Sequence, residues 1–524
     1  MRPSLPSLLA SFAVALAGTA SPLALAAPAA PITPAAIDDT ARRAMQAFDV
    51  PGMAIGIVKD GQLIYAKGYG VRELGKDSPV TPDTLFQIGS NSKAFTAAAL
   101  AILVDEGRIK WDDKVIDYLP QFRMFDPYVT SEFTIRDLLS HRSGLGLGAG
   151  DLMFFPATDF TRAEIMRGLR HLKPVAGFRA KYGYDNVLYM VAGEVVSAVS
   201  GKSWEDFVDQ RILQPLKMSS CVPSFKRISD RSHFAEPHAV ADGKLRQIPV
   251  ENIAVIGAAG AMSCNVSGLA KWIETQLAAG QSPGGARLFS EERSADMWTV
   301  NTVVPVRPEY TALLNTHFMG YGMGWELLDE FGFQRVSHTG AVPGGATWIS
   351  MIPELKLGVI VLTNQSDFAA TESVGNQILY AYVGAPKRDL IKLLSARRDS
   401  HEQAANSIES EVAKTVAASP QSSLPLDDYV GRYADPWRGN VEVRKDGPRL
   451  VLKFSRTDKL EGELLPYLGN MFVVRWADRG LNADAFVRFS QSFDGGIEGF
   501  TMRAISPETD FSFDFQDLNF VRSR

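Results

Sequence analysis

The sequence predicts an α+β protein with two domains, in which an antiparallel sheet flanked by helices is followed by a small all-β barrel. Three observations favour this class. Strand-like runs stand at both ends of residues 35–385 with helical segments between them, a polar, alanine-rich stretch covers 386–425, and short alternating runs separated by turn residues fill 426–524. A chain of 524 residues is also longer than one compact core usually allows.

The N-terminus predicts a signal peptide, residues 1–26. Arg2 supplies a basic start, an apolar run follows, and Ala-Leu-Ala at 24–26 forms a small-residue cleavage site. A membrane anchor is the alternative, but Pro22 and Pro28 interrupt the apolar stretch. We therefore expect a periplasmic or secreted protein with no transmembrane segment in the mature chain.

The first domain, 35–385, begins with a predicted hairpin. The run GMAIGIVKDGQLIYAKGYG contains two β-rich stretches joined by Asp60-Gly61, a dipeptide suited to a tight turn. Near the end of the domain, ATWISMIPELKLGVIVLTN predicts two more strands. Helices are expected over 94–106 and in SGLAKWIETQLAAG. The simplest arrangement is one sheet built from both ends of the domain.

The remaining segments predict a connector and a second domain. Residues 386–425 favour a helical linker with a flexible end, where few contacts between domains are expected to cross. From 426 to 524, the turn signals Asp446-Gly447, Gly469-Asn470 and Asp494-Gly495-Gly496 separate short alternating runs. This pattern is typical of a small antiparallel sheet or barrel.

Composition limits the partners. A net charge of −5 gives no support to nucleic-acid binding. Cys221 and Cys264 are too few for a disulfide framework or a thiolate metal cage, so we expect two buried thiols, with pairing in an oxidising compartment as the alternative. The sequence has no zinc-type histidine spacing and no phosphate-binding glycine loop. We therefore expect a small-molecule or peptide substrate, with no metal and no cofactor.

The run FQIGSNSKAF, residues 86–95, holds the first candidate for chemistry. Gly89 allows a sharp turn, Ser90 can cap the helix that follows, and Gly107 suits the end of that helix. Ser90 and Lys93 are three residues apart and share a helix face. Apolar surroundings and the helix dipole disfavour a charged Lys93, which can then accept a proton from the serine. By itself, such a pair also occurs by chance in a chain of this length.

Two further motifs accompany this pair. Tyr184-Asp185-Asn186 precedes a predicted helix, and His338-Thr339-Gly340 ends a strand-like run. In this order the motifs resemble those of the serine β-lactamase and penicillin-binding-protein superfamily, in particular the branch of class C β-lactamases and D-alanyl-D-alanine peptidases, which pairs Ser-x-x-Lys with Tyr-x-Asn. FTIRDLLSHRSGLG and YGMGWELL also match stretches typical of that branch, and the resemblance covers most of residues 40–385.

The resemblance implies a role for each motif residue. Ser90 is the acylated nucleophile, Lys93 assists its deprotonation, and Tyr184 shuttles the proton to the leaving group, with Lys93 and His338 as sources of positive charge beside it. Taken alone, Tyr184 could be a packed aromatic residue and Asn186 a helix cap. The remaining roles are Asn186, His338, Thr339 and Gly340 for orienting and binding substrate, and the backbone N–H groups of Ser90 and Ala341 for the oxyanion hole.

His338 departs from the family pattern, in which a lysine usually begins the third motif. A histidine titrates within the working pH range and anchors a carboxylate more weakly. This difference argues against avid penicillin binding and resembles the esterase and D-amino-acid peptidase members. His141 is similar to a position near the rim of the site, with structural hydrogen bonding as the alternative.

These features predict an exported serine hydrolase that cleaves D-amino-acid peptides, peptidoglycan fragments or carboxylic esters through an acyl-Ser90 intermediate. A class C-type β-lactamase and a non-catalytic penicillin-binding sensor are the alternatives. The last hundred residues resemble the lipocalin-like C-terminal domain of some of these hydrolases, which implies homo-oligomer assembly or a cover over the active site. A domain that only adds stability is the alternative.

Overall fold

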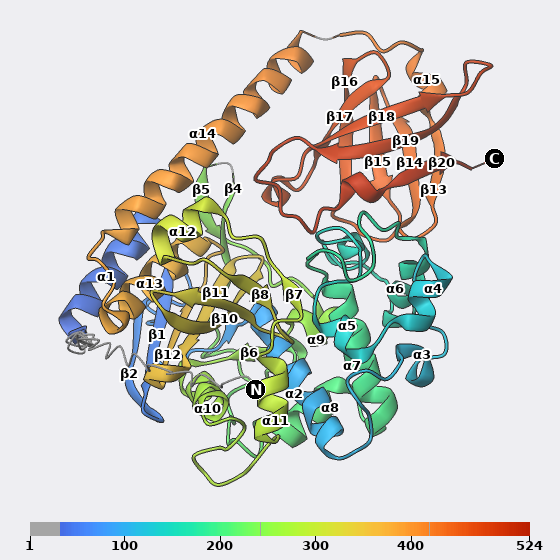
Figure 1. Ribbon diagram of the computed structural model, residues 1–524. Helices are drawn as coiled ribbons and strands as arrows, with labels where there is room; N and C mark the ends of the chain where they lie inside the picture. Colours follow the sequence, from blue (N-terminus) through green and yellow to red (C-terminus); the bar gives the residue numbers. More distant parts are fainter. Residues whose placement is uncertain (1–31, 242, 419, 524) are drawn as a thin grey trace, which may run out of the picture.

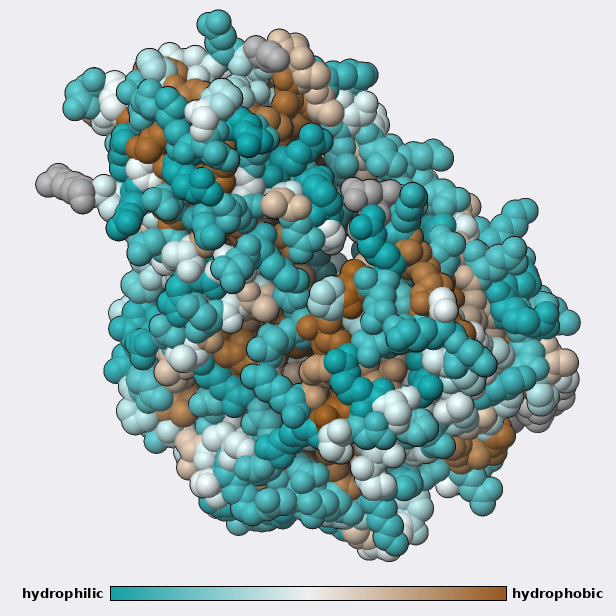
Figure 2. All heavy atoms as spheres, turned by 180° about the vertical axis from the view of Figure 1, so that it is seen from behind, coloured by the Kyte–Doolittle hydropathy of each residue, from teal (hydrophilic) through white to brown (hydrophobic). Residues whose placement is uncertain are grey.

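A computed structural model describes residues 32–241, 243–418 and 420–523, so the predicted signal peptide lies outside the described residues. Figure 1 shows a body of sheet and helices, a long helix that leaves it along one side, and a barrel that packs against the body. From behind, Figure 2 shows a mostly hydrophilic face with separate hydrophobic patches, hollowed where the barrel meets the body. Among the described residues, no helix is long and apolar enough to span a membrane.

The predicted antiparallel sheet of the first domain is confirmed. Its strands are β1 (Gly52–Lys59), β2 (Gln62–Gly70), β7 (Thr302–Val303), β8 (Met319–Tyr321), β9 (Glu326–Glu330), β10 (Phe333–Val342), β11 (Gly345–Ile352) and β12 (Leu357–Thr363). The order is β2-β1-β12-β11-β10-β9-β8-β7. Both ends of the domain therefore meet inside one sheet, where Gly56 of β1 pairs with Ile360 of β12.

The hairpin at the start of this sheet forms as predicted. Lys59 pairs with Gln62, and the two residues between them have positive φ angles, +52° at Asp60 and +75° at Gly61. A turn of this kind matches the twist of the two strands. The short Asp-Gly sequence therefore fixes the register of β1 against β2.

Helices cover both faces of the sheet. The helices α1 (Pro34–Ala47) and α13 (Phe368–Val383) pack on one face, where Ile37 and Val374 share a buried cluster with Ile55 and Val361. The helix α10 (Val266–Leu277) lies on the other face, so close that a Cβ atom on Gly56 would lie 2.6 Å from Val266. Glycine in the strand permits this approach.

The rest of the first domain is helical and surrounds α2 (Ser92–Asp105), whose side chains are almost all buried. Its alanine-rich sequence allows neighbouring segments to pack closely around it. Gly107, with a φ of +69°, follows the helix, as expected. The surrounding helices are α3 (Val115–Tyr118), α4 (Pro127–Glu132), α5 (Ile135–Leu139), α6 (Arg162–Gly168), α7 (Asn186–Ser200), α8 (Trp204–Val208), α9 (Gly257–Gly260), α11 (Glu291–Met297) and α12 (Pro308–Leu314).

Two small sheets complete the domain. The strand β3 (Phe86–Gln87) pairs with β6 (Ser263–Cys264), and β4 (His238–Ala241) pairs with β5 (Lys244–Gln247). The first pair lies immediately before the turn that carries Ser90. It therefore ties residues around 263 to the candidate nucleophile.

The connector is the helix α14 (Leu390–Ala417), which begins on the body and runs to the barrel (Figure 1). Near its end, Val412 clusters with Val473 and Ile505 of the barrel, beside a cavity of about 360 Å³. The helical part of the predicted linker is therefore a packed spacer.

The second domain is a closed antiparallel barrel, as predicted. A short helix, α15 (Leu426–Tyr429), precedes strands that each pair with the next, and β13 closes the barrel on β20. Asp446-Gly447, Gly469-Asn470 and Asp494-Gly495-Gly496 lie in the turns between strands, where the central glycines have positive φ. The strands are β13 (Gly431–Asp435), β14 (Gly439–Asp446), β15 (Arg449–Phe454), β16 (Glu461–Leu468), β17 (Met471–Trp476), β18 (Ala485–Gln491), β19 (Ile497–Ala504) and β20 (Asn519–Arg522).

The two domains share an extensive interface, so the expectation of few contacts between them is wrong. Lys459 of the barrel forms an ion pair of 2.6 Å with buried Glu251, and the Phe513 ring lies 5.1 Å from that of Phe155. One buried hydrophobic cluster contains side chains of both domains. The composition of the linker marks the boundary along the chain, but the barrel contacts segment 146–160 and Glu251, which lie far from it in sequence.

We expect deletion of residues 426–524 to destabilise the first domain, because apolar side chains such as Phe154 and Phe155 lose their cover. A loss of a few kcal/mol lowers Tm by about 5 °C or more in a domain of this size. Thermal unfolding followed by circular dichroism, together with soluble yield, measures the effect.

The matched control keeps the barrel but cleaves the chain at a protease site inserted near residue 421. The nicked protein should keep its Tm, because the interface survives the cut. A truncated chain as stable as the full chain would show that the interface adds nothing to the stability of the first domain.

Candidate active site

The candidate nucleophile stands on a sharp turn between β3 and α2. Gly89 has a φ of +51°, Ser90 is half-buried in the 3₁₀ turn Gly89–Asn91, and α2 begins at Ser92. The sequence predicts that Ser90 caps the helix, and this prediction is wrong. The cap position belongs to Asn91, whose side chain instead donates to Thr347 Oγ1 at 2.9 Å. The Ser90 hydroxyl is left free to face the site.

Lys93 is fully buried one turn along from Ser90. Its Nζ lies 2.9 Å from Ser90 Oγ, 2.7 Å from Asn186 Oδ1 and 3.0 Å from the carbonyl oxygen of Ala259. Burial lowers the pKa of Lys93 to about 7, and the nearby carboxyl groups of Asp151 and Asp185 oppose that shift only in part. A substantial fraction of the amine is therefore neutral near pH 7 and able to accept a proton.

Tyr184 lies close to Ser90 and Lys93, two residues before α7 begins. Asp185 caps that helix by accepting from the Leu188 N–H at 3.0 Å, so Asn186 is not the cap and can face Lys93. The Tyr184 hydroxyl is hydrogen-bonded to Ser90, and Lys93 Nζ lies 4.7 Å from the Tyr184 ring centre.

Desolvation raises the pKa of Tyr184 well above 10, although the hydrogen bond to Ser90 opposes the shift. The resting tyrosine is therefore a neutral phenol. The expectation of a phenolate-like Tyr184 does not describe this resting site, and a neutral hydroxyl suits proton donation.

His338 lies in the middle of β10 and is only 2% exposed. Its Nδ1 is 2.6 Å from the carbonyl oxygen of Thr339, which can only accept, so Nδ1 carries the hydrogen. The Tyr321 hydroxyl then donates to Nε2 over 2.9 Å. Tyr321 begins the run YGMGWELL, whose pattern alone indicates no chemical role for the tyrosine.

The expectation that His338 titrates in the working range is wrong. Burial and the positive charge of Lys93 lower the pKa of His338 to about 3. His338 is therefore neutral at physiological pH, with both ring nitrogens occupied. It supplies no positive charge to Tyr184.

The end of β10 lies directly against the turn that carries Ser90. A Cβ atom on Gly89 would lie 2.6 Å from the Ala341 nitrogen, and one on Gly340 would collide with the carbonyl oxygen of Ile88. Thr339 is half-buried and Ala341 is exposed beside them. The fold thus places the backbone of Ala341 beside the Ser90 turn, as an oxyanion hole requires.

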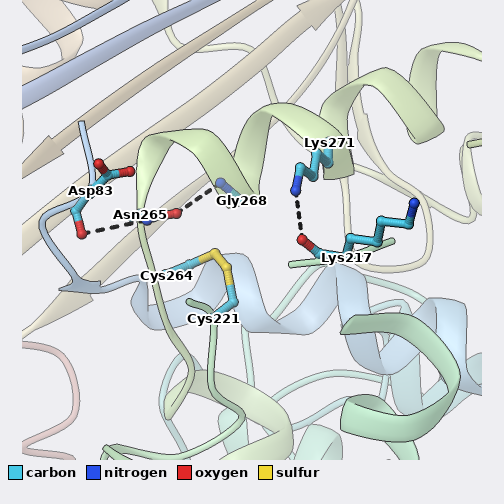
Figure 3. Close-up of a disulfide and its surroundings, with 7 residues drawn as sticks. All are labelled: Asp83, Lys217, Cys221, Cys264, Asn265, Gly268 and Lys271. Atoms are coloured by element: carbon cyan, nitrogen blue, oxygen red, sulfur yellow. Dashed lines mark hydrogen bonds between the residues drawn. A yellow bond between two sulfur atoms is a disulfide. The ribbon is translucent and has the colours of Figure 1, made fainter. Parts of the chain in front are cut away.

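Residues 258–264 support this turn from behind. The Ile88 N–H donates to the carbonyl oxygen of Met262 at 2.9 Å, and Phe86 pairs with Cys264. Cys264 forms a disulfide with Cys221 beside α10 (Figure 3), so the expectation of two thiols is wrong. The bridge between Val222 and Ser263 brings together cysteines that are 43 residues apart.

His141 packs behind Tyr184 with a ring separation of 4.3 Å and is fully buried. Its Nδ1 accepts from the Asp185 N–H at 3.1 Å. Desolvation and the charge of Lys93 hold the pKa of His141 well below 6.5. His141 is therefore a buried residue with a structural hydrogen bond, and it does not lie at the rim of the site.

The barrel also contributes to the site, which the sequence did not indicate. The Phe511 ring lies 5.9 Å from that of Tyr184, and Ser512 Oγ donates to Asp151 Oδ2 at 2.9 Å. The same Asp151 oxygen accepts from Asn186 Nδ2 at 2.8 Å. These residues belong to no motif, and Phe511 stands more than 300 positions after Tyr184. No sequence signal could have joined them.

Phe511 packs on Tyr184, and other exposed apolar side chains belong to the neighbouring segments around Gly146 and Gly148. Leu147, Val175 and Phe511 are 52%, 68% and 40% exposed. The Gly148 N–H donates to the Tyr184 carbonyl oxygen at 2.8 Å, and a Cβ atom on Gly148 would lie 2.7 Å from the Phe511 ring. The rim next to the tyrosine is therefore apolar. No group of three potential metal ligands occurs among the residues that the structure describes.

Known proteins share both domains. A family model described as beta-lactamase matches residues 37–381, and one for a domain of unknown function (DUF3471) matches 415–522. The relative named unguisins hydrolase ungD', from Aspergillus campestris, is 28% identical over 483 residues, 87% of each chain. Penicillin-binding protein 4 of Amycolatopsis lactamdurans is 28% identical over 60% of this chain and 81% of its own.

A solved structure shares the fold. The octameric penicillin-binding protein homologue from Pyrococcus abyssi superposes with a TM-score of 0.61 at 23% identity, over 94% of this chain and 100% of that chain. The shared fold agrees with the sheet, helices and barrel described above. At this identity the likeness shows the fold alone.

We expect kcat/KM to rise with pH through an apparent pKa of about 7, because only the neutral Lys93 amine accepts the serine proton. His338 should add no limb in this range, since its pKa lies near 3. The measurement is the pH profile of p-nitrophenyl butyrate hydrolysis between about pH 5 and about pH 9, a range that brackets the pKa of Lys93.

His338→Gln is the control, because it removes the imidazole and keeps a neutral polar group. Its limb should coincide with that of the wild type. A limb that disappears in this variant would show that the titrating group is His338.

Proposed function

The chain belongs to the beta-lactamase family, and we propose that it is a serine hydrolase that cleaves ester or amide bonds through an acyl-Ser90 intermediate. The observation that carries the proposal is the buried Lys93 amine, 2.9 Å from Ser90 Oγ and with a pKa of about 7. A relative over most of the chain is itself named a hydrolase. Such an amine can activate a serine hydroxyl without a histidine base.

The acylation step uses the groups around Ser90. Neutral Lys93 takes the Ser90 proton while Oγ attacks the substrate carbonyl carbon, and the backbone N–H groups of Ser90 and Ala341 receive the oxyanion. When the tetrahedral intermediate collapses, the bond to the leaving group breaks. Tyr184 donates its proton to the leaving oxygen or nitrogen and regains one from the Lys93 ammonium, so the proton balance closes.

Deacylation repeats the same steps with water as the nucleophile. Tyr184 takes one proton from the attacking water while it passes its own proton to neutral Lys93, and the Ser90 oxygen then leaves with that proton from the Lys93 ammonium. The products are the free acid and the original enzyme. Each group returns to its starting protonation state.

The substrate class that fits this site lacks a carboxylate next to the scissile bond. His338 is neutral and its nitrogens are occupied, so it gives no cationic anchor. Leu147, Val175 and Phe511 offer an apolar rim instead. Carboxylic esters and amides with apolar groups therefore fit better than penicillins, while small D-amino-acid peptides and peptidoglycan fragments remain within the proposal when their carboxylates lie elsewhere.

We propose that the protein acts in the periplasm or outside the cell. The Cys221–Cys264 disulfide supports this placement, because such bonds persist in oxidising compartments. We also propose a homo-oligomer assembled through the barrel, by analogy with the Pyrococcus abyssi homologue, whose title describes an octamer. Light scattering of the full chain tests the assembly, and a monomer would refute it.

Ser90→Ala should lower kcat/KM for p-nitrophenyl butyrate by about 10⁴-fold or more and leave Tm almost unchanged, because the hydroxyl caps no helix. Lys93→Ala should cause a comparable loss, since nucleophile and base act as a unit. Mass spectrometry of the acid-quenched reaction should locate the acyl group on Ser90. Wild-type rates in Ser90→Ala would remove Ser90 from the mechanism.

A substrate panel separates the proposal from its alternatives. We expect turnover of p-nitrophenyl butyrate or a D-alanyl anilide, with kcat/KM for a chromogenic cephalosporin at least about tenfold lower, because neutral His338 offers the cephalosporin carboxylate no positive charge. Faster loss of the cephalosporin would indicate a β-lactamase. Stable labelling by a fluorescent penicillin without any turnover would indicate a sensor.

A further inference from the structure

The loop between β19 and β20, residues 505–518, crosses from the barrel into the first domain. Ser512 Oγ donates to Asp151 Oδ2 at 2.9 Å. The Asp514 carboxylate accepts from the N–H groups of Gly150 and Leu152, at 2.6 and 3.1 Å. Asp151 and Asp514 are fully buried, and Ser512 is 9% exposed. The loop therefore holds residues 150–152 through three polar contacts in an interior setting.

From Asp151 the contacts continue to the lysine. Asp151 Oδ2 accepts from Asn186 Nδ2 at 2.8 Å, and Asn186 Oδ1 accepts from Lys93 Nζ at 2.7 Å. An amide has a donor end and an acceptor end, so the group on one side decides which end faces the other side. Because Asp151 Oδ2 is an acceptor, it turns Asn186 Oδ1 toward the lysine.

This orientation decides where the lone pair of neutral Lys93 points. A neutral amine has two N–H groups, and the oxygens of Asn186 and Ala259 receive them. The lone pair is then directed to the remaining partner, Ser90 Oγ. If the Asn186 amide were reversed, its N–H group would face the lysine and compete for that lone pair.

The Ser512 hydroxyl helps to keep Asp151 in its acceptor role. Burial and the neighbouring Asp514 raise the pKa of Asp151 well above its usual range, whereas hydrogen bonds from Asn186 and Ser512 oppose that shift. Both donors point at Oδ2. Oδ2 therefore stays an acceptor even when a proton resides on Oδ1.

We propose that the barrel is part of the active site: Ser512 and Asp514 are positioning residues that hold Asp151 and, through Asp151 and Asn186, orient Lys93 toward Ser90. This inference rests on the proposed function, because it concerns the proton transfer from Ser90 to Lys93. The alternative role for these contacts is stability of the interface alone. If Ser512 positions the site, loss of its hydroxyl slows acylation. If it only stabilises the interface, the loss lowers Tm alone.

The test compares three variants of the full chain. Ser512→Ala removes the donor, Ser512→Thr restores it, and Ser506→Ala removes a serine of the same loop whose Oγ accepts from the Glu508 N–H of that loop. The readouts are the burst rate constant for acylation by p-nitrophenyl butyrate, KM, and Tm. A purely structural contact would change Tm without changing the acylation rate constant.

Ser512→Ala should slow acylation by about 3- to 10-fold, the worth of one buried hydrogen bond, with KM unchanged. Ser512→Thr and Ser506→Ala should stay within about twofold of the wild type, because neither removes a donor to Asp151. A second pair tests the next link. Asp151→Asn keeps an acceptor and should retain most of the rate, whereas Asp151→Leu removes it and should lose about 100-fold or more.

The outcomes separate this inference from the proposed function. A wild-type burst that Ser512→Ala leaves unchanged, with or without a lower Tm, overturns the inference alone. A slower burst that Ser512→Thr does not restore also counts against it. Ester turnover by the wild type without any acyl group on Ser90 overturns the proposed function, and the inference with it.

Discussion

The structure around the candidate site depends on one constraint, the burial of the Lys93 amine. A fully buried lysine is costly to charge, and its pKa falls to about 7. The interior must also satisfy its hydrogen-bonding capacity, and three segments do so: the turn with Ser90, the start of α7 with Asn186, and the carbonyl of Ala259. Asp185 caps the start of α7, and the strand β6, which pairs with β3 just before the Ser90 turn, is held by a disulfide. The buried amine of Lys93 thus connects the Ser90 turn, α7 and α9 through hydrogen bonds.

Three of the aromatic groups near this amine are neutral hydrogen-bonding groups. His338 has a pKa of about 3, and the pKa of Tyr184 lies well above 10. His141 accepts from a backbone N–H and is also held neutral. Only the carboxyl groups of Asp151 and Asp185 favour the charged amine, and they offset its desolvation in part. A neutral His338 also offers no positive charge to an anionic ligand.

The barrel packs against the part of the first domain that lies next to the candidate site. The segment 146–160 carries Asp151 and several apolar residues, and the barrel covers it with polar and aromatic contacts. Ser512 thereby stands three hydrogen bonds from Lys93 Nζ, along a path through Asp151 and Asn186. Buried polar groups arranged in such a series are sensitive to the loss of any one member. The barrel, which looks like an accessory domain in the sequence, is therefore connected to Lys93 by a series of hydrogen bonds.

The sequence alone determined the α+β class, the β1–β2 hairpin, the barrel turns and the family, because turn residues, hydrophobic periodicity and Ser-x-x-Lys spacing act over a few positions. It also named Ser90, Lys93, Tyr184 and Asn186, which the fold brings together. Only the tertiary structure decided the low pKa of His338, the Cys221–Cys264 disulfide, and the contact of Ser512 with Asp151. Burial and proximity between distant segments are properties of the packed chain. A motif gives the identity of a histidine or a serine, whereas desolvation and its neighbours in space give its protonation state and its role.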